Sequence, residues 1–262
     1  MRTEKLGVIL IALAFMLVVI FSGVGLFSLK EIDVDFSVSE NTNAEKIQKT
    51  LDSHLGENLL FFNVDSVRDS LKDNHYVEVV SVKKDYPNVL RVSIKERREV
   101  FFIHSGEKFF VTTEDGFVLK EMAESEVDAQ LLSDKILLNV HNLNVSNIVV
   151  GQKLVCENVE VLSTIFEMAK SVNLTDCIKT ISIESIDALG EYNATFVTHT
   201  GVAMKIEEIL IKGVDKTLNA FYVYDNELTD YQKADGEIQS YLMYDGRYRV
   251  TYNQQEVWTS GN

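Results

Sequence analysis

A run of 24 residues near the N-terminus, residues 6–29, contains no ionisable side chain. As an α-helix rising ~1.5 Å per residue it would be about 36 Å long, enough to cross a hydrocarbon core of about 30 Å. A cleaved secretory signal has a shorter apolar core of about 7–15 residues and a small-x-small cleavage site. This run is longer and no such site follows it, so we predict a transmembrane helix at residues 6–29.

The charges before this run predict its orientation. Arg2, Lys5 and the terminal amine precede it, and positively charged segments stay on the cytoplasmic side of a membrane. The expected protein is therefore single-pass in the plasma membrane, with a cytoplasmic stub at residues 1–5 and everything after Lys30 outside. A stub this short cannot carry an activity, so the function is expected in the helix or in the ectodomain.

The overall composition is that of a folded protein with a strong acidic balance. Hydrophobic residues make up 46% of the chain, which is enough to build cores. The formal net charge is −15, the wrong sign for neutralising phosphates, so nucleic-acid binding is excluded. The two cysteines, Cys156 and Cys177, are too few for a disulfide scaffold and lack zinc-ligand spacing. Outside the cell they could pair or remain buried thiols, and the sequence leaves both open.

The segment after the apolar run predicts the element order β-α-α-β-β. A strand with loose alternation is expected at residues 29–36. Thr42 and Glu45 fit a capping box at the start of a helix that runs to about residue 55, where Gly56 ends it. The remaining expected elements are a short helix carrying Val64, Val67 and Leu71, and two strands at residues 77–84 and 89–96 joined by Asp85-Tyr86-Pro87-Asn88.

This order resembles a POTRA domain, and four motifs in sequence resemble the FtsQ/DivIB family of bacterial division proteins. The motifs are Gly56-Glu57-Asn58-Leu59, Tyr76-Val77, Tyr86-Pro87 and Glu96-Arg97-Arg98-Glu99-Val100. Glu99 stands where the family usually has proline, which blurs the domain junction. The resemblance implies a POTRA domain at residues 30–98, an extracytoplasmic β domain at residues 99–254 and a tail at residues 255–262.

The predicted second domain is a mixed β-sheet with interspersed helices, so the expected fold class is α+β. Asp115-Gly116 marks a hairpin turn within residues 109–119. A helix is expected at residues 157–171, with an apolar stripe of Val161, Ile165, Phe166 and Met168. The last helix is expected at residues 207–224. Further strands are expected within residues 181–185, 194–206 and 237–252, with turns at Thr200-Gly201 and Asp245-Gly246.

The sequence contains no motif that predicts catalysis. Hydrolase, acyl-enzyme and phosphate-loop signatures are absent, and the five histidines are scattered without ligand spacing. With 40 acidic residues, carboxylate pairs arise by chance, so a pair argues for chemistry only if the fold brings it to a cleft. We therefore predict no catalytic, cofactor-binding or metal-binding residue and no enzymatic activity.

The strongest candidate for a binding site is the last hairpin. After the turn, Tyr248, Val250 and Tyr252 alternate with Arg247 and Arg249, which is typical of a strand with one buried face. This strand either completes the sheet or forms an open edge to which a partner adds a strand. The predicted partner-binding residues are Tyr244, Asp245, Gly246, Arg247, Tyr248, Arg249, Val250 and Tyr252.

The family resemblance implies a non-catalytic scaffold at the division septum that uses no cofactor. The implied partners are FtsB/DivIC-like and FtsL-like coiled-coil proteins, with a septal penicillin-binding protein as a further candidate. Through them the chain would help to control septal peptidoglycan synthesis. The competing hypotheses are a membrane-anchored cell-wall hydrolase and an extracytoplasmic sensing module.

Overall fold

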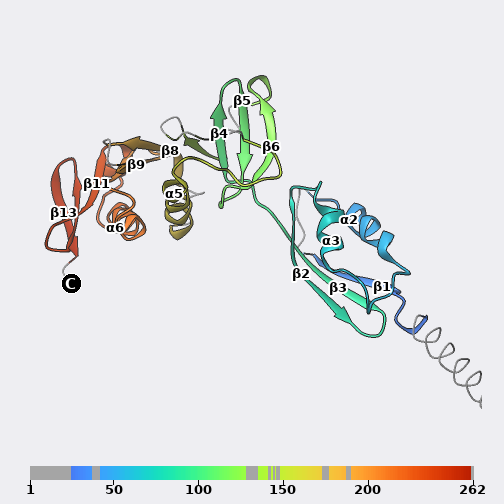
Figure 1. Ribbon diagram of the computed structural model, residues 1–262. Coiled ribbons are helices and arrows are strands. Elements are labelled where there is room, and N and C mark those ends of the chain that lie inside the picture. The colour runs from blue at the N-terminus through green and yellow to red at the C-terminus, as the bar shows by residue number, and fades with distance from the viewer. Residues whose placement is uncertain are drawn as a thin grey trace, which may run out of the picture. The chain divides into compact units, whose positions relative to one another are not determined.

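The computed structural model describes residues 25–36, 42–127, 135–140, 143, 145, 148–172, 177–186 and 190–260. It divides into two compact units, one ending at Arg97 and the other beginning at Arg98 (Figure 1). The predicted cytoplasmic stub and residues 6–24 of the predicted transmembrane helix lie outside the described residues. Within the described part of the chain, no helix has the length and apolar character needed to cross a membrane.

The first unit is a three-stranded sheet in the order β1-β3-β2, with two helices. β1 runs parallel to β3, and β2 runs antiparallel to it. In chain order the elements are β1 (Glu31–Phe36), α2 (Ala44–Leu51), the 3-10 helix η1 (Asp52–His54), α3 (Asp65–Leu71), β2 (Val77–Asp85) and β3 (Val89–Glu96). The predicted β-α-α-β-β order is confirmed.

One side-chain face of each element in the first unit lies in a common core. Leu90, Val92 and Ile94 alternate along β3 and are buried, as the period of a strand predicts. The helices contribute residues four positions apart to the same core, and on α2 these are the buried Ile47 and Leu51. Leu55, at the predicted end of this helix, lies beyond the observed end of α2 and is exposed.

The start of α2 differs from the predicted capping box. The N-cap residue is Asn43, whose side-chain oxygen accepts a hydrogen bond from the backbone N–H of Lys46 at 3.0 Å. The cap is therefore one residue later than Thr42. Because the third helical position then falls on Lys46, no acidic side chain stands where a capping box requires one.

The last residues of the predicted transmembrane run are folded into the first unit. Leu29 is 1% exposed and lies in the core. The backbone N–H of Leu29 donates to the carbonyl of Glu57 at 2.8 Å, and that of Leu59 donates to Phe27 at 2.7 Å. The sequence predicts that the membrane helix ends at residue 29, whereas the structure places residues 27–29 in the first unit.

The second unit is built on a ten-stranded sheet in the order β13-β12-β11-β10-β9-β8-β7-β4-β5-β6. The neighbouring pairs β4–β7, β7–β8 and β10–β11 are parallel, and the others are antiparallel. Its elements are β4 (Phe101–Ser105), β5 (Lys108–Thr112), β6 (Val118–Ala123), η2 (Glu124–Glu126), β7 (Ile136–Asn139), α5 (Val159–Ser171), β8 (Ile178–Ser185), β9 (Tyr192–Thr198), β10 (Ala203–Ile206), α6 (Gly213–Asn226), η4 (Gln232–Ala234), β11 (Glu237–Leu242), β12 (Tyr248–Tyr252) and β13 (Gln255–Ser260).

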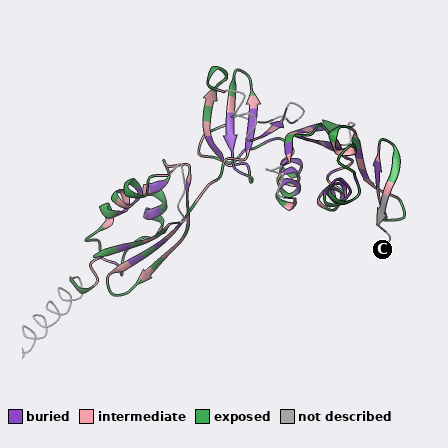
Figure 2. Cartoon of the chain, turned by 180° about the vertical axis from the view of Figure 1, so that it is seen from behind, coloured by how far each residue is buried: buried purple, intermediate pink, exposed green. Residues whose placement is uncertain are grey.

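Helices α5 and α6 lie side by side against the sheet and close its core (Figure 1). Buried positions run through the strands and through both helices (Figure 2). Three members of the predicted α5 stripe, Val161, Ile165 and Met168, are buried, and the fourth, Phe166, is partly buried against the same core. The hairpin at Asp115-Gly116 is also confirmed, because β5 and β6 pair antiparallel across it.

Helix α6 begins six residues later than predicted. Glu208 and Lys212 have positive φ angles of 45° and 52°, so residues 207–212 form a loop and the helix starts at Gly213. Apolar spacing does not reveal this, since left-handed backbone is set by the surrounding contacts.

Cys156 and Cys177 are not joined by a disulfide in this structure. Cys156 is buried, and its Sγ donates to the carbonyl of Asn158 at 2.9 Å. Burial raises the pKa of this thiol, which keeps it protonated and unreactive.

Candidate partner-binding edge

The predicted partner-binding residues occupy one continuous hairpin at the C-terminal end of the sheet. Four of them form the turn between β11 and β12, namely Tyr244, Asp245, Gly246 and Arg247. The other four, Tyr248, Arg249, Val250 and Tyr252, lie on β12. Tyr244 is fully exposed at the tip of the turn, and Gly246 takes the left-handed conformation there with φ +83°.

The prediction that β12 is an open sheet edge is wrong. β12 pairs with β11 on one side and with β13 on the other. Asn253 and Gln254 have positive φ angles of 46° and 65°, the geometry of a two-residue hairpin turn that sends the chain back along β12. Residues 255–260, expected to form a tail, are therefore β13, and β13 is the terminal strand of the described sheet.

The apolar side chains of β12 serve the chain's own fold. Val250 is 0% exposed and lies in the core of the second unit. The hydroxyl of Tyr248 donates to a carboxylate oxygen of Asp215 on α6 at 2.8 Å. Desolvation, together with this carboxylate, raises the pKa of Tyr248 to about 12. These contacts attach β12 to α6 and leave little of its apolar face for a partner.

The two arginines of the hairpin both have acidic neighbours within the chain. Arg247 forms an ion pair with Asp245 at 2.7 Å inside the turn, and its hydrogen bonds lower the pKa of that carboxyl. Arg249 lies 3.4 Å from a carboxylate oxygen of Glu256 on β13. Neither arginine is an uncompensated charge, so long-range attraction of an acidic partner is weaker than the sequence predicts.

Two surface features near this edge were missed by the sequence reasoning. The first is β13 itself, signalled by Asn253, a residue that readily adopts positive φ, and by the alternating segment that follows it. The second is an exposed stripe on α6, where Leu218 is 43% exposed and Tyr222 is 47% exposed. These positions are four residues apart and share one helix face. The stripe lies beside β12, because Asp215 of the same helix accepts the Tyr248 hydrogen bond.

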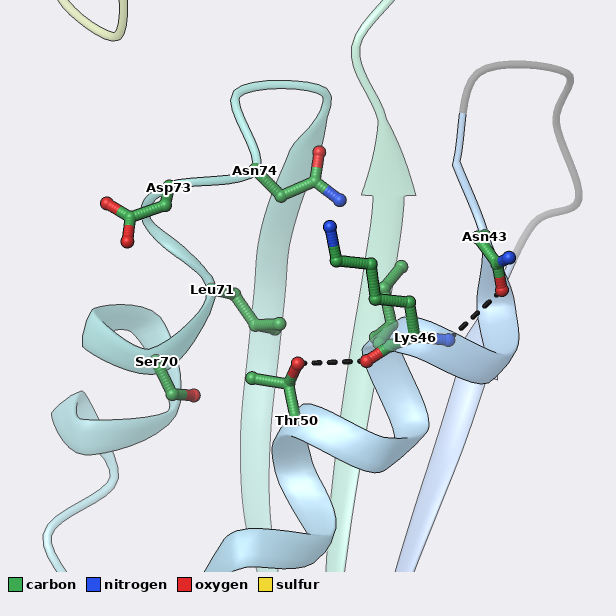
Figure 3. A pocket seen from close by; sticks show the side chains of 8 residues that line it. Asn43, Lys46, Thr50, Ser70, Leu71, Asp73 and Asn74 are labelled. Atoms are coloured by element: carbon green, nitrogen blue, oxygen red, sulfur yellow. Dashed lines mark hydrogen bonds between the residues drawn. The ribbon is translucent and has the colours of Figure 1, made fainter.

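One cavity lies in the first unit and does not resemble a catalytic site. It has a volume of about 530 Å³ and lies between α2 and α3, with Lys46 and Asp73 as its charged lining residues. Lys46 extends toward Asn74, whereas Asp73 points away from it (Figure 3). Asn43 and Thr50 are already hydrogen-bonded to the backbone of α2. Among the residues that the structure describes, no cluster of three or more potential metal ligands exists.

The first unit matches a known domain family. Residues 27–97 match the family described as "POTRA domain, FtsQ-type". Together with the relatives named below, this match bears out the resemblance to the FtsQ/DivIB family that the motifs indicate.

The relatives are bacterial proteins named for cell division. The chain is 27% identical to cell division protein DivIB of Clostridium acetobutylicum over 103 residues, 39% of each chain. It is 23% identical to DivIB of Clostridium botulinum strain Loch Maree over 213 residues, which cover 80% of this chain and 79% of that protein. The matches to DivIB of C. acetobutylicum and of C. botulinum strain Hall span 39% and 47% of those proteins, less than half of each.

A solved structure also has a limited likeness to the chain. It is the major extracytoplasmic domain of the trans isomer of DivIB from Geobacillus stearothermophilus, at 13% identity and a TM-score of 0.27. The likeness covers 48% of this chain and 96% of that one.

Proposed function

We propose that this chain is a non-catalytic division protein of the plasma membrane that joins partner proteins at the septum. The names of its relatives support the division role. The proposed partners are DivIC/FtsB-like and FtsL-like coiled-coil proteins, through which the chain would help to control septal peptidoglycan synthesis. The N-terminus is proposed to be cytoplasmic and both units extracytoplasmic.

The terminal position of β13 is the observation that carries the proposed mode of binding. Within the described residues, β13 pairs with β12 on one side and with no strand on the other. Six residues present an edge of about 20 Å at ~3.3 Å per residue. A strand from a partner would pair with the main-chain groups along this edge. The proposed binding site is therefore shifted from β12 to β13, with the β11–β12 turn beside it.

The exposed stripe of α6 supports a partner that combines a strand with a helix. Leu218 and Tyr222 lie on the surface beside β12. An amphipathic helix binds such a surface through residues spaced three and four apart. A coiled-coil partner that continues into a short strand would use both the stripe and the edge.

A proline scan of β13 tests the edge. Successive backbone amides point to opposite sides of a strand, so one of Trp258 and Thr259 donates toward β12 and the other toward the free edge. Trp258→Pro and Thr259→Pro are compared with Trp258→Tyr and Thr259→Val, which keep the amide. Binding to a DivIC-like protein is measured by titration, and folding by circular dichroism.

The expected result is that one proline variant keeps its unfolding midpoint but binds about tenfold more weakly than its control. Losing one hydrogen bond costs ~0.5–1.5 kcal/mol, and the ring obstructs the incoming strand. The other proline variant disrupts the β12–β13 ladder and lowers the midpoint. If both variants bind as well as their controls, strand addition at β13 is refuted.

The hydrolase hypothesis has a separate test. Purified peptidoglycan incubated with the full chain should release no soluble fragments if the protein is a scaffold. Release of fragments would favour the membrane-anchored hydrolase. A response of partner binding to a soluble cell-wall ligand would instead favour the sensing module.

A further inference from the structure

Exposed apolar side chains gather at one end of the first unit. Phe61 is 85% exposed, Leu26 56%, Tyr86 53% and Leu60 45%. Large apolar side chains normally lie in a core, and contiguous exposed groups of them mark an interaction surface. We call these four residues, together with Phe27, the proximal patch.

Backbone and ring contacts bring the members of the proximal patch together. The ring of Phe27 packs edge-on against that of Tyr86, with centroids 6.0 Å apart and an interplanar angle of 80°. The carbonyl of Phe27 accepts the N–H of Leu59, which precedes Leu60 and Phe61 in the chain. Three segments that are distant in sequence therefore meet at one end of the unit.

Two lysines flank the proximal patch. Lys84 donates through Nζ to the carbonyl of Leu60 at 3.4 Å. Lys30 is exposed, and its backbone N–H donates to the carbonyl of Asn88 next to the turn that holds Tyr86. Two acidic residues of the neighbouring segments are engaged locally, since Glu57 lies 2.7 Å from His54 and Asp85 lies 2.9 Å from Arg91. Glu31, which follows Lys30 in the chain, is exposed.

The proximal patch begins where the charge-free N-terminal run ends. Because residues 27–29 are part of the first unit, the run available to cross a membrane is residues 6–26, about 31 Å as a helix. This length still spans a hydrocarbon core of about 30 Å and leaves no linker between the core and the fold. If residues 6–26 span, the end of the unit that carries Leu26 lies within the headgroup layer.

We propose that the proximal patch inserts into the outer headgroup layer of the bilayer and holds the first unit against the membrane. The chemistry fits a lipid surface, because aromatic and leucine side chains prefer the boundary between headgroups and acyl chains. A lysine near an anionic headgroup adds electrostatic attraction to the lipid surface. The occupant is thus an anionic lipid surface, and the proposal rests on the predicted membrane span.

The test places a tryptophan reporter in the patch of the full chain. In a Trp258→Phe background, Phe61→Trp is compared with the control Val80→Trp. Val80 is 56% exposed on β2 and lies six residues, or about 20 Å, along the strand from Tyr86. The headgroup layer is only about 5–8 Å thick, so a control about 20 Å from the patch lies outside it when β2 leads away from the bilayer, as the proposal requires. Each variant is reconstituted into nanodiscs that contain phosphatidylglycerol, with or without brominated acyl chains.

The expected result is that brominated lipid quenches the tryptophan at position 61 severalfold more than the one at position 80, with a blue-shifted emission. Both positions are exposed, so both variants should keep the thermal midpoint of the parent, which is measured alongside. Equal quenching at the two positions overturns the proposal and leaves the patch to a protein partner. Failure of the chain to enter nanodiscs overturns the predicted span and this proposal together, whereas binding at β13 is measured independently.

Discussion

The side chain of Lys216 on α6 is fully buried, and it gives the second unit a predictable dependence on pH. Its Nζ donates to the carbonyls of Glu207 and Glu208, the latter at 2.8 Å. Desolvation lowers the pKa of this lysine from 10.5 to about 8, although the charges of Glu208 and Glu207 act in the opposite direction.

The sign and size of the effect follow from the two pKa values. Between pH 8 and pH 10.5 the lysine is neutral in the folded chain but still protonated in the unfolded chain. The unfolded state then binds more protons, so stability rises with pH in this window. A pKa difference of one corresponds to ~1.36 kcal/mol, so the lowering from 10.5 to about 8 changes the free energy of unfolding by about 3 kcal/mol in total. Neutral amine still donates, so both carbonyls keep their hydrogen bonds.

The measurement is urea unfolding of the full chain in detergent, followed by the fluorescence of Trp258, the only tryptophan in the sequence. The parent is compared with Lys216→Met, which keeps the length of the side chain but cannot titrate. The free energy of unfolding of the parent should gain about 2–3 kcal/mol relative to the variant between about pH 8 and pH 10.

Comparing the parent with Lys216→Met removes the contributions of other titrating groups to the pH dependence of stability. Tyr248 has a pKa raised to about 12, and the pKa of the Cys156 thiol is also raised, so both lower the stability as the pH rises. They do so in the parent and in the variant alike. Parallel stability curves for the two chains would refute the reasoning, because they would mean that Lys216 titrates equally in the folded and unfolded states.

Two further predictions concern backbone positions. Gly116 has φ +77°, and a Cβ there would overlap the ring of Phe166, so Gly116→Ala should destabilise the second unit by well over ~1 kcal/mol; an unchanged urea midpoint would contradict this. Asn43 caps α2 through the N–H of Lys46, so Asn43→Ala should cost about 1 kcal/mol while Asn43→Asp costs little. Thermal unfolding of both Asn43 variants checks the second prediction, and equal loss in the two would count against the cap.

The sequence predicted the local elements well because each depends on neighbours a few residues apart. The stripe of Val161, Ile165 and Met168 and the turn at Asp115-Gly116 have signatures within one window. Cap positions were less certain, since Thr42 and Asn43 are both good helix starters and adjacent. The loop before α6 was missed because positive φ at Glu208 and Lys212 has no pattern in the side chains.

The candidate binding site shows more clearly that local sequence patterns do not predict the order of strands in a sheet. Alternation identified the β12 strand and its buried Val250, and chain order alone suggested that this strand was the last. The turn at Asn253 and Gln254 reversed that conclusion, because Gln254 takes a conformation usually left to glycine. A single added strand moved the free edge from β12 to β13.

Composition, periodicity and turn chemistry by themselves determined that this chain has an apolar N-terminal run, a β-α-α-β-β order of elements after it and a sheet-rich second unit. Only the tertiary structure decided which strand ends the sheet, which arginines are neutralised and where Leu29 lies. The physical reason is how far apart along the chain the interacting residues lie. Hydrogen bonds within a helix or hairpin are specified by nearby residues, whereas strand order and burial depend on which distant segments pair, and that is settled by the packing of the whole core.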